Sequence, residues 1–402
     1  MKKQLVISIL IVGFLVIATA LVILFGSGYR LGFGGNGAIL SGTGLLVTTS
    51  SPNGAQVFIN GHLTTATDNT INLAPGVYDI KIFKDGYFPW EKKITIKNEV
   101  VSKADALLFP NAPKLESITN IGISNPVVDP SKTKIAYSVA SQSAVKNGIY
   151  VLDMTSRPIL TLQSNSTQIV NDTLNSFSNS ILSWSPDSAQ LLTKLKGVSF
   201  STTYLLQSTS LNDNPQDVTE TISTVNNAWA KLKTEKEKAL MDSLPKKLKK
   251  TVAENFNILE WSADETKILY AASKSATLSP IIVPTLIGTD STPEVRNIKK
   301  DEIYVYDIKE DRNYKILDLL PKKQEENSPL SIKWYPDSKH LVYVHDQKID
   351  MMEYDAMNPT TVYAGPFVDD YVFPWPDATK LVILTNLGNP SIAPNLYTIG
   401  LK

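Results

Sequence analysis

The fold is decided by the stretch Leu182-Ser183-Trp184-Ser185-Pro186-Asp187-Ser188-Ala189-Gln190-Leu191-Leu192. An apolar strand ends at a tryptophan, a polar turn follows, and a second apolar strand begins within a few residues. In the turn, proline presets its own φ, while aspartate and serine side chains accept hydrogen bonds from nearby backbone N–H groups. The stretch therefore predicts two antiparallel strands joined by a tight reversal of the chain.

The same pattern occurs five times between residues 111 and 402. The positions equivalent to Pro186 are 130, 186, 263, 336 and 376, so successive copies are 56, 77, 73 and 40 residues apart. A period of about 40 residues is typical of one β-propeller blade, and the longer spacings indicate blades that carry insertions. The sequence predicts an all-β ectodomain that contains a β-propeller of about five blades. We expect the tryptophans of the repeat to pack between blades and its aspartates to stabilise turns: Trp184, Asp187, Trp261, Asp264, Trp334, Asp337, Trp375 and Asp377.

The five copies resemble the repeats of periplasmic TolB-type propellers, which are related to WD-repeat propellers. The resemblance implies a closed ring, and rings of this type usually have six blades. We expect a strand within residues 114–119 to complete the last blade, which otherwise ends early at Lys402. A sixth, divergent blade within residues 155–180 or 205–225 is the alternative.

The first 25 residues predict a short cytoplasmic N-terminus and a transmembrane helix. Residues 5–25 carry no charge, and a helix of this length spans about 30 Å, the thickness of a bilayer's hydrocarbon core. Because two lysines precede this run, we expect the N-terminus to stay in the cytoplasm and the rest of the chain to lie outside the cell membrane. The anchor positions that we single out are Leu5, Phe14, Leu21 and Phe25.

A cleaved signal peptide is the alternative, since Ala18-Thr19-Ala20 has the form of a cleavage site. However, the apolar run continues beyond that site and is longer than a signal-peptide core. Residues 26–44 then hold eight of the chain's 20 glycines. Gly-rich segments behave as flexible coils, so residues 26–43 are expected to form a flexible linker.

Residues 44–110 predict a small antiparallel β-sandwich, because short runs of alternating apolar and polar residues are separated by turn sequences such as Asn60-Gly61. Three of its motifs are Pro52-Asn53-Gly54-Ala55, Leu73-Ala74-Pro75-Gly76-Val77-Tyr78 and Gly86-Tyr87. In this order they resemble the PEGA domain family, with Asn53 in place of the family's acidic residue. The resemblance implies a surface-associated β-sandwich of envelope proteins whose motif residues are structural.

Two insertions interrupt the propeller repeat, at 226–256 and 274–297. The first is helical in character and carries eight lysines against four acidic residues between positions 231 and 254. We favour a solvated helical hairpin over a docking site for an anionic polymer or lipid. The second is an apolar loop that must be buried or meet a partner, and we favour burial against the propeller. Its candidates for partner contact are Ile281, Ile282, Leu286 and Ile287.

The composition disfavours an enzyme. The chain has no cysteine and three histidines, and it contains neither a nucleotide-binding fingerprint nor a nucleophile motif. His340 and His345 are five residues apart along a strand and therefore on opposite faces, which makes them a poor pair of metal ligands. We expect no catalytic residues, no cofactor and no metal. The net charge is zero, so nothing favours nucleic acid as a partner.

Together these features predict a membrane-anchored, extracytoplasmic binding or scaffolding protein of the cell envelope. Its propeller would present loops to an envelope protein or a cell-wall glycan. Two other classes stay open. One is a glycan-active enzyme that uses carboxylates in the propeller channel, and the other is an architectural component of a surface layer. The sequence does not indicate an oligomeric state.

Overall fold

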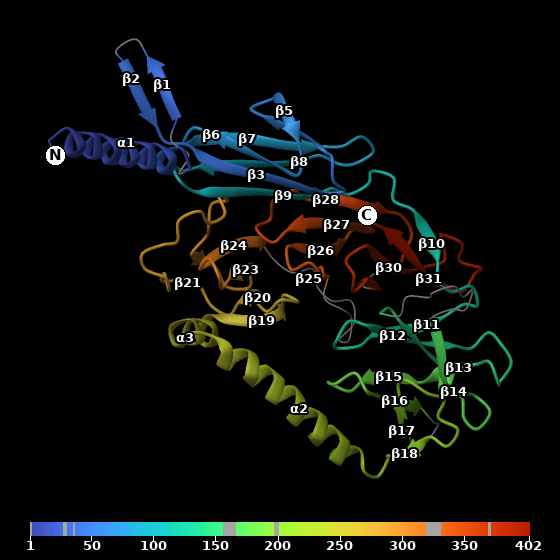
Figure 1. The fold of residues 1–402 in the computed structure, drawn as a ribbon. Helices are drawn as coiled ribbons and strands as arrows, with labels where there is room; N and C mark the ends of the chain where they lie inside the picture. Colours follow the sequence, from blue (N-terminus) through green and yellow to red (C-terminus); the bar gives the residue numbers. More distant parts are fainter. Residues whose placement is uncertain are drawn as a thin grey trace. The chain divides into compact units, whose positions relative to one another are not determined.

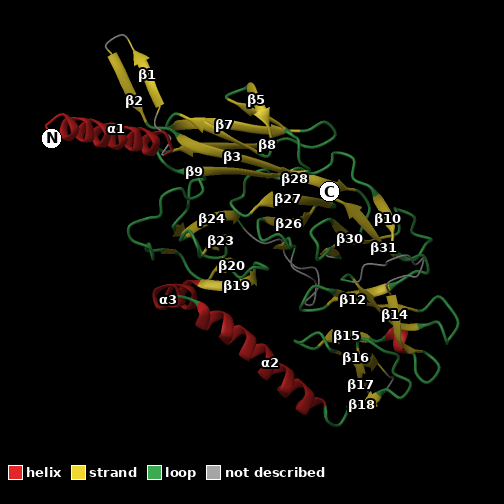
Figure 2. Ribbon diagram, in the orientation of Figure 1, coloured by secondary structure: helices red, strands yellow, loops and turns green. Residues whose placement is uncertain are grey.

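A computed structural model describes residues 2–26, 30–34, 37–155, 166–196, 201–318, 331–368 and 371–402. The chain divides into two compact units. The first comprises Met1–Asn111 together with Ile282–Pro293, and the second comprises Ala112–Ile281 and Glu294–Lys402. Strands outnumber helices among the described residues, and helices occur at three places (Figure 1; Figure 2).

Helix α1 (Lys2–Gly26) has aliphatic side chains on all its sides. Within residues 7–23 every side chain is exposed except that of Ala18, which is half-buried, and Phe14 and Leu21 are 71% and 51% exposed. The side chains of Leu5 and Phe25 lie outside the described residues. Among the described residues, no helix has both the length and the apolar character that crossing a membrane requires.

The Gly-rich segment differs from the flexible coil that we expected. Strands β1 (Arg30–Gly34) and β2 (Gly37–Ser41) pair antiparallel, from Arg30 opposite Ser41 to Gly34 opposite Gly37. The physical reason is that apolar residues alternate with glycine in β1 and form a short run in β2, so the segment has strand character despite its glycines. A hairpin therefore replaces most of the linker.

The N-terminal β-domain consists of two sheets. One has the strand order β6-β3-β9 and the other the order β5-β4-β7-β8. The expectation of a purely antiparallel sandwich is wrong at one place, because β3 and β9 pair parallel, with Leu45 opposite Val101. Apolar side chains from both sheets form one core, in which Leu46, Val57 and Ile82 have no exposed surface. The strands are β3 (Gly44–Ser51), β4 (Gln56–Ile59), β5 (His62–Ala66), β6 (Asn69–Leu73), β7 (Gly76–Phe83), β8 (Trp90–Ile96) and β9 (Val101–Leu107).

The second unit contains five four-stranded antiparallel sheets among its described residues, consistent with propeller blades. We number these blades along the chain. Blade 1 is β11 (Ser124–Val128), β12 (Lys134–Val139), β13 (Gly148–Asp153) and β14 (Ser166–Asn171). Blade 2 is β15 (Ile181–Trp184), β16 (Gln190–Lys196), β17 (Ser201–Gln207) and β18 (Gln216–Asp217), and a short helix, η1 (Phe177–Asn179), precedes it.

The remaining blades follow the same order. Blade 3 is β19 (Phe256–Trp261), β20 (Lys267–Ala272), β23 (Ile303–Asp307) and β24 (Arg312–Leu317). Blade 4 is β25 (Ile332–Trp334), β26 (His340–His345), β27 (Lys348–Glu353) and β28 (Thr360–Ala364). Blade 5 is β29 (Val372–Pro374), β30 (Lys380–Thr385), β31 (Asn395–Gly400) and β10 (Leu115–Ser117).

Blade 5 joins the two ends of the unit, as the sequence predicted. Strand β10 pairs with β31, with Leu115 opposite Ile399 and Ser117 opposite Tyr397. The two segments proposed to hide a sixth blade instead supply outer strands, because β14 lies in the first and β18 in the second. That alternative is therefore wrong for the described parts of these segments. Neither segment carries the repeated turn that joins the first two strands of each blade.

The turn after each first strand has the same backbone conformation in all five blades. A residue other than glycine adopts a positive φ at the equivalent position each time: Lys132, Ser188, Glu265, Ser338 and Ala378, with φ of 59°, 62°, 58°, 59° and 54°. Two of these residues also connect neighbouring blades. The Ser131 N–H donates to Ser188 Oγ (3.2 Å), and the Asp264 N–H donates to Ser338 Oγ (3.0 Å). The serine that follows Pro-Asp in these two turns thus receives a hydrogen bond from the preceding blade.

The first insertion forms two helices, α2 (Ile222–Ser243) and α3 (Lys246–Asn255), separated at Pro245 as the sequence indicated. Helix α2 has no buried residue, whereas Leu248 and Val252 of α3 are 1% exposed and pack on the core of blade 3. Lysines and glutamates pair at i,i+4 spacing on both helices, for example Lys231 with Glu235 (3.9 Å). These features fit a solvated helical insertion that is attached through α3.

Candidate functional site

The residues of the repeat hold blades together. Trp184, Trp334 and Trp375 are no more than 9% exposed, and Trp261 is half-buried. The indole N–H of Trp184 donates to the carbonyl oxygen of Val127 in blade 1 (2.9 Å), and that of Trp334 donates to the carbonyl oxygen of Glu260 in blade 3 (3.3 Å). Each of these two tryptophans thus bonds to the first strand of the preceding blade.

The repeated aspartates lie in the turns. Asp187 accepts a hydrogen bond from Ser185 Oγ (2.5 Å), Asp264 from Ser262 Oγ (2.7 Å) and Asp377 from Thr379 Oγ1 (2.6 Å). The Ser185 hydroxyl and the Ala189 N–H lower the pKa of Asp187 below its ordinary value, because both stabilise the carboxylate. Each of these three carboxylates accepts a hydrogen bond from a hydroxyl of its own turn.

The two histidines of β26 bind separate carboxylates. His340 is buried and its Nδ1 lies 2.6 Å from Asp337 Oδ2, whereas His345 Nε2 lies 2.8 Å from Asp350 Oδ2. Burial would lower the pKa of His340, but Asp337 and, more weakly, Glu353 raise it above its ordinary value of 6.5. Among the residues that the structure describes, no group of three or more ligand-type side chains could hold a metal ion.

The His340 pair gives the second unit a pH-dependent stability. Because the folded pKa of His340 is raised, its contribution is complete below the ordinary pKa of 6.5 and is lost as the pH rises through the higher folded value. We expect the free energy of unfolding to fall by about 1.5–3 kcal/mol above that value, the usual contribution of a hydrogen bond to a charged group. Urea titrations between pH 6 and 9 measure it, and the decline should be absent in His340→Gln.

A polar cluster involves the first strands of blades 3 and 4 and the turn after the first strand of blade 1. Glu260 of blade 3 forms an ion pair with Lys132 of blade 1. Its carboxylate also accepts a hydrogen bond from the backbone N–H of Trp334 in blade 4 (2.8 Å). Lys333 of blade 4 donates to the carbonyl oxygen of Val372 in blade 5 (2.9 Å). Glu260 thus connects blade 3 to blades 1 and 4. Glycoside hydrolysis requires two carboxylates with distinct roles facing one cavity, an arrangement that these contacts do not create.

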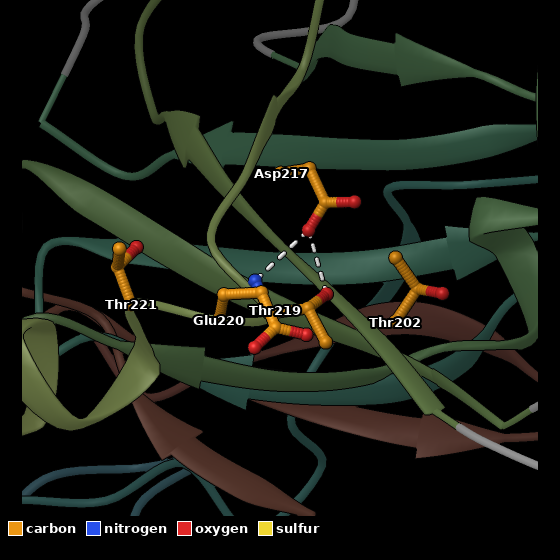
Figure 3. Close-up of a pocket in the computed structure, with 5 residues that line it drawn as sticks. All are labelled: Thr202, Asp217, Thr219, Glu220 and Thr221. Carbon is orange, nitrogen blue, oxygen red and sulfur yellow. Dashed lines mark hydrogen bonds between the residues drawn. The ribbon is translucent and has the colours of Figure 1, made fainter.

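A shallow pocket of about 340 Å³ lies beside β18, just before α2 begins, and is lined by Thr202, Asp217, Thr219, Glu220 and Thr221 (Figure 3). Asp217 Oδ1 accepts hydrogen bonds from the Thr219 N–H (2.9 Å) and the Thr219 hydroxyl (2.6 Å), which lower the pKa of Asp217. The same Asp-x-Thr turn occurs at Asp377 and Thr379 in blade 5. We therefore interpret Asp217 as a turn residue.

The second insertion supplies the most distinctive surface. The two ends of this insertion lie in the second unit, where β21 (Ala276–Thr277) pairs with β22 (Asn297–Ile298). The Ile281 N–H donates a hydrogen bond to Asp311 Oδ2 (2.6 Å). The segment Ile282–Pro293 then belongs to the first unit. We call this segment the inserted loop.

The inserted loop has a buried polar base. Lys92 Nζ of β8 lies 2.9 Å from Asp290 Oδ2, and these side chains are only 9% and 12% exposed. The Thr95 N–H of the same strand donates to Ser291 Oγ (3.0 Å). Burial would raise the pKa of Asp290, but Lys92 and the Thr292 N–H hold it below its ordinary value. Ion-pair and backbone contacts thus fix the loop to the N-terminal β-domain.

The apolar residues of the inserted loop are exposed at its tip. Val283, Leu286 and Ile287 are 79%, 44% and 76% exposed, and Ile282 is half-buried. Of the four candidates for partner contact, Ile281 alone packs into the core of blade 3. The expected burial of this loop against the propeller is therefore wrong for Leu286 and Ile287. The reason is that the loop is held through Asp290 and Ser291, and these polar contacts leave the apolar side chains in solvent.

Comparison with known families identifies the N-terminal β-domain. The PEGA domain model matches residues 43–109, which include the two sheets and their common core. Residues 43–109 are a PEGA domain. The inserted loop interrupts the sequence of the second unit, and it is bound to the PEGA domain. No curated protein matches the chain.

Solved structures similar to this chain include propellers. The structure of putative TolB from Agrobacterium tumefaciens has 15% sequence identity, a TM-score of 0.21, and coverage of 69% of this chain and 72% of that one. TolB from Acinetobacter baumannii has 14% identity, a TM-score of 0.19, and coverage of 81% and 60%. The likeness of the C-terminal region to TolB-type propellers is distant. The blades described above rest on this chain's own strand pairing.

Proposed function

We propose that this chain is a membrane-anchored, extracytoplasmic protein of the cell envelope that binds or scaffolds other envelope components. Helix α1 is its anchor, the PEGA domain follows directly outside the membrane, and the propeller presents loops to a protein or glycan partner. The proposal describes a binding protein rather than an enzyme. In this proposal the N-terminus of the protein is cytoplasmic, and the PEGA domain and the propeller are extracytoplasmic.

One observation carries the proposal. In α1 the described side chains of residues 7–23 are exposed on every face, and most of them are aliphatic, including Ile9, Leu10, Phe14 and Val22 at 63%, 67%, 71% and 70%. A helix that is apolar all round matches a hydrocarbon environment and not a water-exposed surface. With Leu5, Val6, Leu24 and Phe25, the uncharged run reaches 21 residues in the sequence, which is enough for one span.

The binding role rests on the loops. Binding residues are commonly placed on loops that a rigid scaffold positions, and the inserted loop has this organisation. Its base is fixed by the Lys92–Asp290 ion pair (2.9 Å), while Leu286 and Ile287 stay exposed. An exposed apolar cluster on a fixed support is typical of an interaction surface.

The anchor is tested with the double substitution Phe14→Arg/Leu15→Arg at the middle of α1. Each arginine at the centre of a span costs about 2.5–3.5 kcal/mol of insertion free energy, so we expect most of the protein to leave the membrane pellet after alkaline carbonate extraction. In the control Ser8→Arg the new charge lies near the cytoplasmic end and can reach the headgroups. That variant should remain in the pellet with the unmodified chain.

The orientation is tested by adding protease to intact cells. We expect the propeller to be digested, because it lies outside. Release of the unmodified chain by carbonate would disprove the anchor, and full protection of the propeller in intact cells would disprove the orientation.

A further inference from the structure

The tip of the inserted loop is an uncharged, apolar surface on the PEGA domain. Residues 275–289 contain no charged residue. Val283, Leu286 and Ile287 project 79%, 44% and 76% of their surface into solvent, and Val101 of β9, beside the loop, is 47% exposed. We call these four residues the apolar tip. A partner for this surface must be apolar and need not carry charge.

The position of the apolar tip within the first unit is informative. A Cβ atom on Gly288 would lie 2.8 Å from Val100 Cγ1, so the loop is in close contact with the start of β9. Val101 is opposite Leu45, and the Leu45 N–H donates to the carbonyl oxygen of Val100 (3.0 Å). Leu45 is the second residue of β3, which begins at Gly44. The tip therefore lies at the end of the PEGA domain where the chain arrives from α1.

The hairpin β1–β2 keeps this end close to the anchor. Without it, the residues between Gly26 and Gly44 could extend over roughly 60 Å. Because Arg30 is paired with Ser41, only the segments 26–30 and 41–44 remain to be extended, and their greatest reach is roughly 30 Å including the width of the strand pair. The entry end of the PEGA domain thus stays within reach of the bilayer surface.

The base of the loop gives the tip a fixed place. The Lys92–Asp290 ion pair and the Thr95–Ser291 bond hold residues 290 and 291 against β8. Strand β8 ends at Ile96, and the turn that follows it contacts the entry segment, where the Glu99 N–H donates to the carbonyl oxygen of Thr43 (3.1 Å). Tip, turn and entry segment form one end of the domain.

We propose that the apolar tip inserts into the outer boundary of the lipid bilayer as a second membrane contact beside α1. This proposal rests on the proposed function, in which α1 is the anchor that brings the domain to the membrane. The ligand is the headgroup and acyl boundary of the bilayer, where aliphatic side chains on a folded support are favourably buried. The contact would restrict the tilt of the PEGA domain on its tether.

The absence of cysteine from the chain permits a direct test. Full-length protein is reconstituted into vesicles of phosphatidylcholine and phosphatidylglycerol after Ile287→Cys and labelling with an environment-sensitive fluorophore. The control is Leu63→Cys on β5, an equally apolar residue that is 60% exposed in the same domain. We expect the label at position 287 to emit at shorter wavelength and to be quenched severalfold more strongly by nitroxide-labelled lipid than the label at position 63.

The outcomes separate this proposal from the anchor. If the protein resists carbonate extraction but position 287 behaves like position 63, the tip contact is disproved and the anchor stands. If carbonate releases the protein yet position 287 is quenched by lipid, the tip contact stands and the anchor is disproved. A shift at position 287 without quenching by lipid would show that the label contacts protein instead of lipid, and it would overturn the lipid proposal. Release together with an unquenched label would disprove both.

Discussion

Replacement of Trp334 by alanine is expected to lower the free energy of unfolding of the second unit by about 3–5 kcal/mol, the usual cost of truncating a buried aromatic side chain. Trp334 is 1% exposed, packs in the cluster that joins blades 3 and 4, and donates to the carbonyl oxygen of Glu260. Scanning calorimetry should show a decrease of roughly 10 °C in the midpoint of this unit.

Trp261 provides the matched control, because it occupies the equivalent position of blade 3 but is half-buried. Trp261→Ala should cost clearly less than Trp334→Ala, since less apolar surface returns to water. Equal losses at the two positions would show that the tryptophans do not stabilise the blades through burial.

The second large effect is expected at the base of the inserted loop. Asp290→Ala removes the carboxylate that pairs with the Lys92 ammonium, and breaking a buried ion pair from one side costs about 3–5 kcal/mol. The loss should appear in the first unit, as faster hydrogen exchange of the β8 amides and a lower unfolding midpoint. Asp79→Ala is the control on the same sheet, because the Lys93–Asp79 pair is 78% and 66% exposed and such pairs contribute about 1 kcal/mol at most.

The same pair predicts a pH dependence. The pKa of Asp290 is lowered in the folded state, so its contribution is complete above the ordinary carboxyl value of 3.8 and is lost as the pH falls through the lower folded value. Stability of the first unit should therefore decline more steeply below pH 3.8 in the unmodified protein than in Asp290→Asn. A double substitution Lys92→Met/Asp290→Leu should recover much of the loss, because an apolar pair of similar volume replaces two buried charges. If the double substitution did not recover this stability, the loss in Asp290→Ala would not come from the buried Lys92–Asp290 pair.

Local patterns were sufficient to predict much of the fold. The five copies of the turn between the first and second strands located all five blades, because turn chemistry and alternating strands act over fewer than a dozen residues. The same holds for the division of the helical insertion at Pro245 and for the strand near residue 115. The role of Ser188 and Ser338 as acceptors for the preceding blade was not predicted, although the recurrence of serine at this position was a usable signal.

Contacts between distant residues could not be predicted. Lys92 and Asp290 are 198 positions apart, and neither belongs to a motif, so nothing in the sequence placed the inserted loop on the PEGA domain. The apolar run of the loop suggested burial, but the polar residues that follow it determine where it attaches. The prediction for the Gly-rich segment relied on its glycine content and gave too little weight to the strand-forming residues Phe33, Ile39 and Leu40. It therefore missed the β1–β2 hairpin.

The pairing of β10 with β31 also sets the order of events when the protein is made. Leu115 leaves the ribosome well before its partner Ile399, because the two residues are 284 positions apart in the sequence. At ordinary elongation rates of about 5–20 residues per second, roughly 15–60 s separate the two strands. Throughout that interval blade 5 lacks its C-terminal strand, and β10 has an exposed edge that other chains could bind. Pairing of β10 with β31 therefore waits until Gly400 has been made, and chains that stop before β31 should accumulate as aggregation-prone forms.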